Sequence, residues 1–373
     1  RSSSWLCATT WSTERTLDRF VLHDLVHAYA TELATGQEPS HERRAGQRRL
    51  LEFLTRTAVN ARPLLQPSES DVAVPRTVDG VMPLTFGSER DAREWYQAER
   101  HNLVAGVHLA YALSFDDLCW RLAYANWIYL HLTSSWNDVL RTHKVGLRAA
   151  ERSGDRVGQA HMLSGIGAAY RATGRSQLAV ETQRRALAIF QEVADLPGTA
   201  TALSNLGAAY RDAGRFDDAL VFSRQAYELD RARNEPGNMA ISLYHIGLTL
   251  TAAGRPAEAI PVIGESLGVV RQIGHRRGEA LVVYALATAH ARLGQHDAAV
   301  DHYRAALDIH LENGDRWYQA ATLNGLGDAL HETGRFDENH DAWKHALAIY
   351  EELGAPDAAV LAAKLERHDR AQR

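Results

Sequence analysis

The feature that most constrains the fold of this chain is an internal repeat in which equivalent residues recur 40 positions apart, as Gly174 and Gly214 do. The repeat begins at about Arg156. Small residues also recur five and twelve positions after each glycine. A regular repeat of this length is typical of stacked copies of one supersecondary unit rather than one globular core. The recurrent residues include Gly174, Gly214, Gly254, Gly294 and Gly334, then Ala179, Ala219, Ala259 and Ala299.

Each unit is predicted to be a pair of helices. Apolar residues recur at spacings of three and four, as at Leu203, Leu206 and Tyr210, which indicates an amphipathic helix. The recurrent glycine predicts the end of the first helix, because glycine adopts a left-handed conformation there at little cost. Small residues such as Gly167 and Ala186 allow two helix backbones to approach closely. Since one hairpin cannot bury its apolar face alone, neighbouring hairpins must stack into a superhelix.

The run Leu203–Tyr210, followed by Gly214 and Arg215, resembles the tetratricopeptide repeat (TPR) family. This resemblance extends over about Arg156–Leu353. It implies an all-α fold, a right-handed superhelix of about six helical hairpins whose helices are longer than in the usual repeat of about 34 residues. The sequence departs from the family where an aromatic residue is usual in the second helix, and the residues at that position are Gln183, Ser223 and Ile263, then Tyr303 and Trp343.

The repeat pattern also divides the chain into segments. Trp127 and Ser134 occupy the positions of the two glycines in residues 115–154, which predicts a degenerate first TPR there. Five full TPR units are expected over 155–354, and a C-terminal capping helix over 355–373. The segment before the array predicts helices joined by a proline-rich stretch, and we expect a helical linker segment over 37–114 with a loop over 63–88.

A second resemblance concerns the N-terminal residues. Leu22-His23-Asp24-Leu25 resembles the Met-His-Asp motif that ends the winged-helix subdomain of NB-ARC nucleotide switches, which belong to the STAND ATPases. With Glu99-Arg100-His101-Asn102-Leu103 and the array, it is similar to AfsR-type (SARP) actinobacterial transcriptional regulators. The resemblance implies that residues 1–36 end a winged helix and that this chain is the C-terminal part of a longer regulator. His23 would then contact ATP or ADP in the intact parent only.

The chain itself is predicted to be non-enzymatic and to bind no cofactor. Its three lysines follow histidine, tryptophan and alanine, so no P-loop is present. His23 and His27 are four residues apart on an expected helix, but no third ligand is evident, so no metal site is predicted. No Gly-x-Ser-x-Gly motif or catalytic Cys/His spacing is found either.

Charge and composition exclude other classes of protein. The net charge of -5 argues against a nucleic-acid-binding surface, which needs a basic face. No apolar run is long enough to span a membrane. Two distant cysteines, Cys7 and Cys119, fit a reducing compartment, so a cytoplasmic protein is expected.

The first helices of TPR hairpins line the inner surface of the superhelix, so the resemblance also predicts a partner-binding groove. Its residues would run from basic through aromatic to acidic, and we expect a protein or peptide there. The alternatives are a quorum-sensing-type peptide receptor whose parent has no ATPase, and a scaffold that self-associates. The predicted groove residues are Ser164, Arg171, Ser204, Asn205, Arg211, Tyr244, His245, Leu248, Tyr284, Arg292, Asn324 and Asp328, together with Gly165, Asp212, Thr288, His331 and Glu332.

Overall fold

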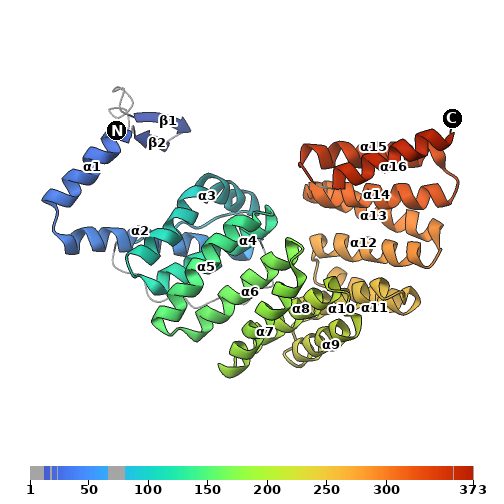
Figure 1. Cartoon of the computed structure of the whole chain (residues 1–373), viewed down its shortest axis with the longest axis horizontal. Helices are drawn as coiled ribbons and strands as arrows, with labels where there is room; N and C mark the ends of the chain where they lie inside the picture. The colour runs from blue at the N-terminus through green and yellow to red at the C-terminus, as the bar shows by residue number, and fades with distance from the viewer. Residues whose placement is uncertain (1–11, 17–18, 23, 66–79, 356, 373) are drawn as a thin grey trace.

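The computed structural model describes residues 12–16, 19–22, 24–65, 80–355 and 357–372. Over these residues the chain is almost entirely helical, and consecutive helices pack as hairpins along one curved array (Figure 1). The hairpin helices are α4 (Asp116–Leu132), α5 (Trp136–Ser153), α6 (Arg156–Ala172), α7 (Ser176–Glu192), α8 (Leu196–Asp212), α9 (Phe216–Ala232), α10 (Pro236–Ala252), α11 (Pro256–Gln272), α12 (Arg276–Arg292), α13 (His296–Asn313), α14 (Arg316–Glu332) and α15 (Phe336–Glu352), and α16 (Asp357–Gln372) follows them.

The N-terminal segment contains a small hairpin and three helices. Strand β1 (Ser12–Thr16) pairs antiparallel with β2 (Arg19–Leu22). The helices that follow are α1 (Asp24–Gln37), α2 (Ser40–Leu65) and α3 (Glu89–Ala112). His23 and Arg1–Thr10 lie outside the described residues, so the winged-helix interpretation stays a prediction.

Helix α2 extends two residues beyond the predicted start of the loop. Pro63 lies inside its last turn, and the helix ends at Leu65. A proline this close to a helix end disturbs few backbone hydrogen bonds, which explains why the helix does not stop before it. Helix α3 then begins at Glu89, where Ser88 accepts a hydrogen bond from the backbone N–H of Asp91 as the N-cap.

The turn glycines adopt the conformation that the repeat predicted. The φ angle is 72° at Gly174 and 79° at Gly294, in the left-handed region. A second left-handed residue ends the second helix of each hairpin. This residue is a glycine in several units, but it is Ala194 and Asn234 in two of them, both with φ of 55°. The backbone path is thus the same in all units even where the residue type differs.

The glycines within the first helices mark close contacts between the two helices of a hairpin. A Cβ atom at Gly207 would collide with the hydroxyl of Ser223, and one at Gly327 would collide with the ring of Trp343. The facing residue lies in the second helix, at the position where the family usually has an aromatic residue. The non-aromatic residues at this position therefore pack directly against the glycine of the facing helix. The facing pairs are Gly167 with Gln183, Gly207 with Ser223, Gly247 with Ile263 and Gly327 with Trp343.

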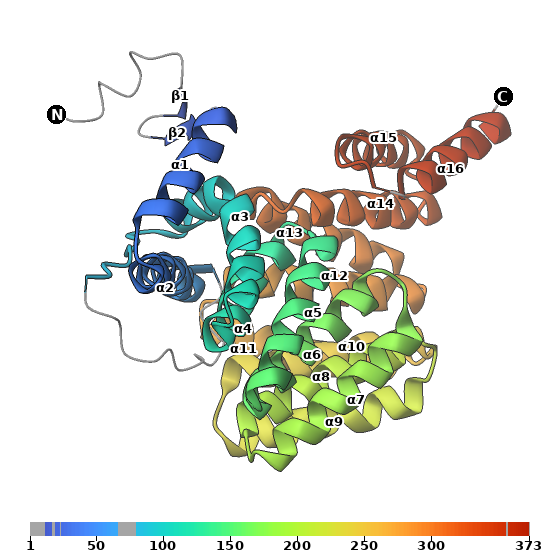
Figure 2. The same cartoon turned by 60° about the vertical axis from the view of Figure 1, so that its left-hand side comes forward.

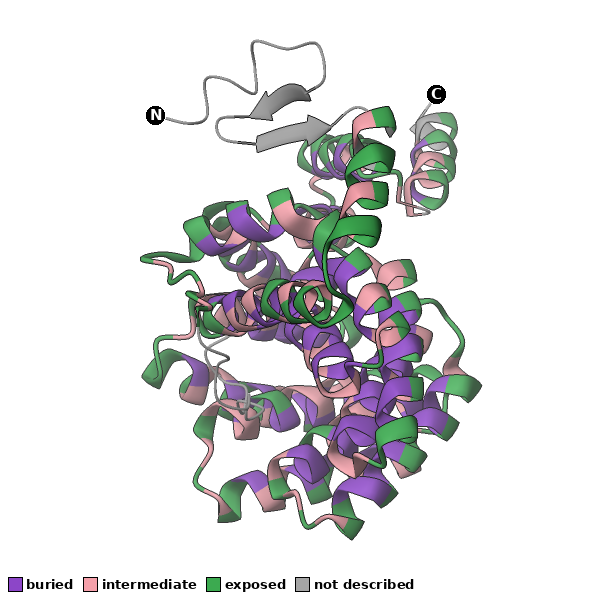
Figure 3. Ribbon diagram, turned by 90° about the vertical axis from the view of Figure 1, so that its left-hand side faces the viewer, coloured by how far each residue is buried: buried purple, intermediate pink, exposed green. Residues whose placement is uncertain are grey.

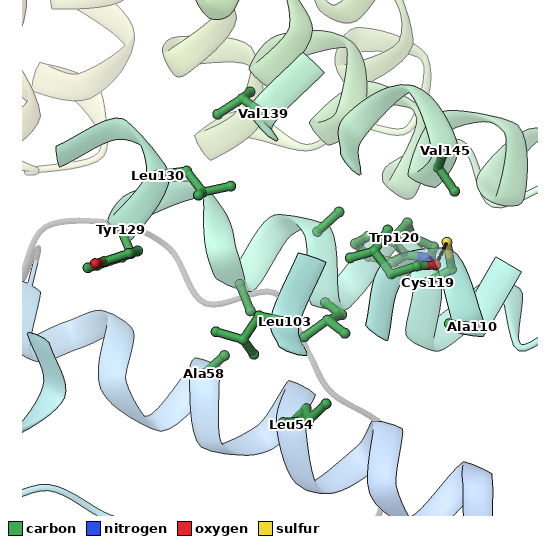
Figure 4. Close-up of a cluster of buried hydrophobic side chains, with 14 of the residues drawn as sticks. Leu54, Ala58, Leu103, Ala110, Cys119, Trp120, Tyr129, Leu130, Val139 and Val145 are labelled. Carbon is green, nitrogen blue, oxygen red and sulfur yellow. Dashed lines mark hydrogen bonds between the residues drawn. The ribbon is translucent and has the colours of Figure 1, made fainter. Parts of the chain in front are cut away.

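The largest part of the core joins the N-terminal helices to the first hairpin. Figure 4 shows Leu54 and Ala58 of α2 beside Leu103 of α3, with Trp120 and Tyr129 of α4 in the same cluster. Further buried clusters follow along the array, so that buried residues run through its length (Figure 3). Helices α2 and α3 therefore share a continuous core with the repeats.

The first helix of each hairpin lies on the inner side of the curve. Successive first helices contact one another from α4 through α14, in addition to their contacts with their own second helices. Figures 1 and 2 show the resulting path, which bends so that the hairpins near α4 and those near α14 form two arms facing each other. Among the described residues, no helix is both long and apolar enough to cross a membrane.

Candidate functional site

Most of the predicted groove residues are at least partly exposed in the structure. Ser164 is buried, whereas Arg292 and Asp328 are exposed. The remaining nine are half-buried, as expected for side chains on a concave surface. These nine are Arg171, Ser204, Asn205, Arg211, Tyr244, His245, Leu248, Tyr284 and Asn324.

A chain of polar contacts crosses three successive first helices. Arg171 of α6 and Arg211 of α8 both pair with Asp212, with nitrogen–oxygen distances of 3.1 Å and 3.0 Å. Nη1 of Arg211 also lies 3.5 Å from Nδ1 of His245 on α10. Burial and the two guanidinium charges lower the pKa of His245 well below its usual value, so its imidazole is neutral near pH 7. The positive charge of this region therefore comes from arginine.

An aromatic group continues this surface towards the C-terminus. The ring centroid of Tyr284 lies 5.8 Å from that of Tyr303 and 6.4 Å from that of Tyr318. Tyr318 in turn stacks on the imidazole of His310. Burial raises the pKa of the hydroxyls of Tyr244 and Tyr284, so both remain protonated. They present large rings with a hydroxyl that can donate a hydrogen bond.

Two residues that the sequence prediction missed lie at the starts of neighbouring first helices. Tyr318 lies near the N-terminus of α14, and Arg277 lies near that of α12, where it pairs with Asp315 at 2.8 Å. Burial raises the pKa of Tyr318, while the charges of Arg277, Arg171 and Arg211 lower it. Positive charges on α12, α6 and α8 therefore contribute to the environment of this hydroxyl.

His131, at the end of α4, is affected by two of the same charges. Burial is the main reason why its pKa falls to about 4, and the charges of Arg171 and Arg277 lower it further. Charges on α6 and α12 thus contribute to the environment of this imidazole on α4. The sequence carried one signal for the missed Tyr318: its equivalents in three other units are Gly158, Gly198 and Gly278, so a large side chain there is a change in the inner surface.

The acidic end of the predicted groove is occupied by the chain itself. Asp328 accepts a hydrogen bond from Nε1 of Trp343 at 2.9 Å and pairs with Lys364 of α16. Lys364 also donates to Oδ1 of Asn324 at 3.2 Å. These two residues therefore hold the C-terminal helix in place. Asn205 likewise makes an internal contact, donating to Ser164 Oγ at 3.3 Å.

The described residues contain no group of three or more histidine, cysteine, aspartate or glutamate side chains arranged to hold a metal ion. What the inner surface does offer is guanidinium groups, hydroxyls and half-buried aromatic rings. These groups bind by charge-assisted hydrogen bonds and by burial of apolar surface. The surface is therefore suited to recognition.

Comparison with known proteins agrees with the repeat architecture. The family model for the tetratricopeptide repeat matches residues 158–232, 238–312 and 279–352. The chain belongs to the tetratricopeptide repeat family. No curated protein sequence matches it.

Several solved structures have a similar fold. A Rap protein complexed with competence and sporulation factor is 13% identical, with a TM-score of 0.53 over 89% of this chain and 99% of that one. The Rap conjugation gene regulator of plasmid pLS20, in complex with the Phr* peptide, is 15% identical, with a TM-score of 0.53 over 76% and 80%. A STAND protein with a tetratricopeptide repeat sensor from Pyrococcus horikoshii is 14% identical, with a TM-score of 0.49 over 99% and 58%. The two Rap proteins share the fold of this chain.

Proposed function

We propose that the inner surface of the array binds a peptide or an extended segment of a partner protein, and that the chain acts as a non-enzymatic sensor. The observation that carries this proposal is that Arg171, Arg211, Tyr244, Tyr284 and Tyr318 lie on five successive first helices, α6, α8, α10, α12 and α14, which contact one another in order. Tyrosine and arginine are the residue types that most often supply binding energy at protein interfaces. A row of both residue types along successive helices favours an extended ligand that contacts several of them.

The nature of known relatives of the fold supports a peptide as the ligand. Two Rap proteins of similar fold are known in complexes, one with competence and sporulation factor and one with the Phr* peptide. This observation also favours the alternative parent, a quorum-sensing-type receptor without an ATPase.

The parent that we favour is an AfsR/SARP-like transcriptional regulator. The support is the motif Leu22–Leu25 ahead of the array, with α2 and α3 joined to the first hairpin by a continuous core. In such a regulator, ligand binding to the array would change the activity of the ATPase and DNA-binding domains through a coupling free energy between the sites. The sequence encoded upstream of Arg1 tests this choice, because a Gly-x-x-x-x-Gly-Lys-Ser/Thr motif is expected there and its absence contradicts the AfsR/SARP assignment.

Selection from a phage-displayed library of random heptapeptides tests the binding function directly. The 373-residue chain should enrich a family of related peptides. In the double variant Tyr244→Ala, Tyr284→Ala, a synthetic peptide of that family should bind more weakly by about 2 kcal/mol or more, which is roughly thirtyfold. Isothermal titration calorimetry measures the difference.

Tyr227→Ala is the matched control for the single variant Tyr244→Ala, which should also bind the peptide more weakly than wild type. Tyr227 and Tyr244 are both half-buried and pack against the same apolar cluster, but Tyr227 lies on α9, a second helix. The two replacements should lower the thermal unfolding midpoint by comparable amounts, and only the inner-surface variant should lose affinity. Equal binding by wild type and the double variant would show that the inner surface is not the contact surface.

A further inference from the structure

Helix α11 differs in composition from the other second helices between α7 and α15. It contains Pro261 inside the helix and two interior glycines, Gly264 and Gly268. The helices α7, α9, α13 and α15 contain neither glycine nor proline. Proline cannot donate the backbone hydrogen bond that a helix interior requires, and each interior glycine favours the unfolded chain. Helix α11 therefore has the weakest intrinsic helix propensity of the five.

Packing within the described structure does not explain the two glycines. A Cβ atom added at Gly264 or at Gly268 would have no heavy atom within 4 Å, and both positions are exposed. At Gly247, by contrast, a Cβ atom would collide with Ile263 of α11. Helix α11 also has only four buried residues, whereas α7 has eight. The two glycines therefore weaken α11 without allowing a close contact in return.

Helix α11 lies where such a weakness has a large effect on the shape of the array. The main packing contacts between the hairpins before it and those after it run through its own hairpin, because α10 contacts α8, α9 and α12, and α11 contacts α12. This hairpin lies between the two arms of the curved path (Figure 1). The following junction also lacks a side-chain cap, since His275 makes no capping hydrogen bond at the start of α12, whereas Asp195 makes one at the start of α8. A small change of angle at α11 is thus a large change in the distance between the ends of the arms.

We propose that α11 is a hinge. The hairpins from α4 to α9 and those from α12 to α15 move as two stiff arms. Bending and transient opening of α11 between Pro261 and Gly268 take up the movement, because proline and glycine are where helices bend and open most readily. The hinge sets the distance between the arms and hence the opening of the inner surface. This inference goes beyond the proposed function, since it concerns the chain without any ligand.

Hydrogen–deuterium exchange of the ligand-free 373-residue chain, followed by mass spectrometry, tests the weakness of the helix. Amides of residues 262–272 should exchange at least about tenfold faster than those of the equivalent residues 222–232 on α9 and 302–312 on α13, after correction for intrinsic exchange rates. The comparison is direct because the three segments occupy the same place in their hairpins.

A stiffened variant, Gly264→Arg with Gly268→Glu, tests whether the glycines are the cause. It gives α11 the residues that α9 has at the equivalent positions, Arg224 and Glu228. The open space at both glycines accepts the new side chains, so the variant should fold with a raised thermal midpoint. Exchange of α11 should slow by about tenfold or more, because two unfavourable helix residues are removed.

Double electron–electron resonance between two spin labels measures the movement of the arms. Labels at Arg141→Cys on α5 and Asp341→Cys on α15, both exposed positions, report the distance between the arms when the two native cysteines are replaced by alanine. The wild type should give a broad distance distribution. In the stiffened variant its width should fall about twofold, because open forms of α11 become rare. A label pair within one arm, at Arg141→Cys and Arg224→Cys, should give a narrow distribution in both proteins.

A control variant separates the stiffness of α11 from the added charges. Ala188→Glu on α7 lies at the position equivalent to Gly268, and Arg184 precedes it by four residues. This replacement creates the same pair of charged side chains on a second helix without removing a glycine. It should change neither the exchange of α11 nor the distance distribution between the arms.

Each unexpected result contradicts the hinge in a specific way. Exchange of α11 that is no faster than that of α9 and α13 would show that the helix is not weak. A narrow arm-to-arm distribution in the wild type, or a broad one that the stiffened variant does not narrow, would show that the arms do not move about α11 even if the helix opens. Because no ligand is present, these failures leave the proposed peptide binding standing, and a peptide library without binders leaves the hinge standing.

Discussion

Asp155, at the N-terminus of α6, supports the first full repeat through both oxygens of its carboxylate. Oδ1 accepts the backbone N–H of Gly158 at 2.9 Å and thereby caps the helix, and Oδ2 accepts the Nε1–H of Trp120 at 3.0 Å. Trp120 is only 1% exposed, so the indole N–H loses its partner when the carboxylate is removed. The cap contributes about 1 kcal/mol. A hydrogen bond to a charged group contributes about 1.5–3 kcal/mol, so Asp155→Ala should destabilise the chain by about 2.5–4 kcal/mol.

Asp195→Ala is the matched comparison one repeat later. Its Oδ1 accepts the N–H of Gly198 at the same 2.9 Å, but its Oδ2 is 4.0 Å from the nearest ring nitrogen of His161 and makes no hydrogen bond there. This replacement removes the cap alone and should cost about 1 kcal/mol. The difference between the two variants measures the hydrogen bond to Trp120.

Urea unfolding followed by circular dichroism measures the free energy of unfolding of both variants. The slope of this free energy against urea concentration should be the same as in the wild type. A double-mutant cycle with Trp120→Phe then isolates the pair, and its coupling energy should be about 1–2 kcal/mol. Equal losses for Asp155→Ala and Asp195→Ala, with no coupling in the cycle, would refute the reasoning that the buried indole depends on this carboxylate.

Three further changes test the packing of the repeats, each by thermal unfolding. Ala226→Leu, at a fully buried position, should lower stability by about 1–3 kcal/mol through overpacking, and an unchanged midpoint would contradict the close helix contact there. Ala194→Gly should raise stability by about 0.5–1 kcal/mol, because Ala194 has a φ of 55°. His310→Leu should stabilise the chain at pH 7 by about 1 kcal/mol, since both ring nitrogens are buried without partners among the described residues. Burial lowers the pKa of His310 to about 4. As pH falls from about 6.5 to 4, the histidine of the unfolded chain takes up a proton and that of the folded chain does not, so the wild type loses stability. The advantage of the leucine variant should therefore grow over that range.

The repeat architecture was accessible from the sequence because it depends on local rules. The left-handed turn at Gly174 and the close contact at Gly207 each involve residues within one hairpin, and every further unit repeats the same signal. Nearest-neighbour packing then builds the superhelix without any long-range information. The end of α2 was harder to place, because Pro63 is compatible with both a loop and a last helical turn.

The composition of the binding surface was only partly accessible, because it depends on the curvature summed over several hairpins. No single repeat encodes the angle that brings Arg277 towards Arg171 and His131. The internal use of Asp328 by Lys364 was hidden for a similar reason, since α16 lies outside the repeat pattern that defines the groove positions. Sequence reasoning therefore left the partners of individual side chains on the first helices undetermined.

The position of the proposed peptide-binding surface has a consequence for signalling. A solenoid is held mainly by contacts between neighbouring hairpins, so α6 and α14 are not coupled by direct packing. A peptide that contacts Arg171 and Tyr318 at once would add such a coupling and favour the conformations in which the two arms are close. The charges of Arg93 and Glu89 on α3 contribute to the pKa of Asp315 at the start of α14. A change in the distance between the two arms would therefore change the electrostatic interaction between α14 and the N-terminal helices, which continue the core of the array towards the N-terminus.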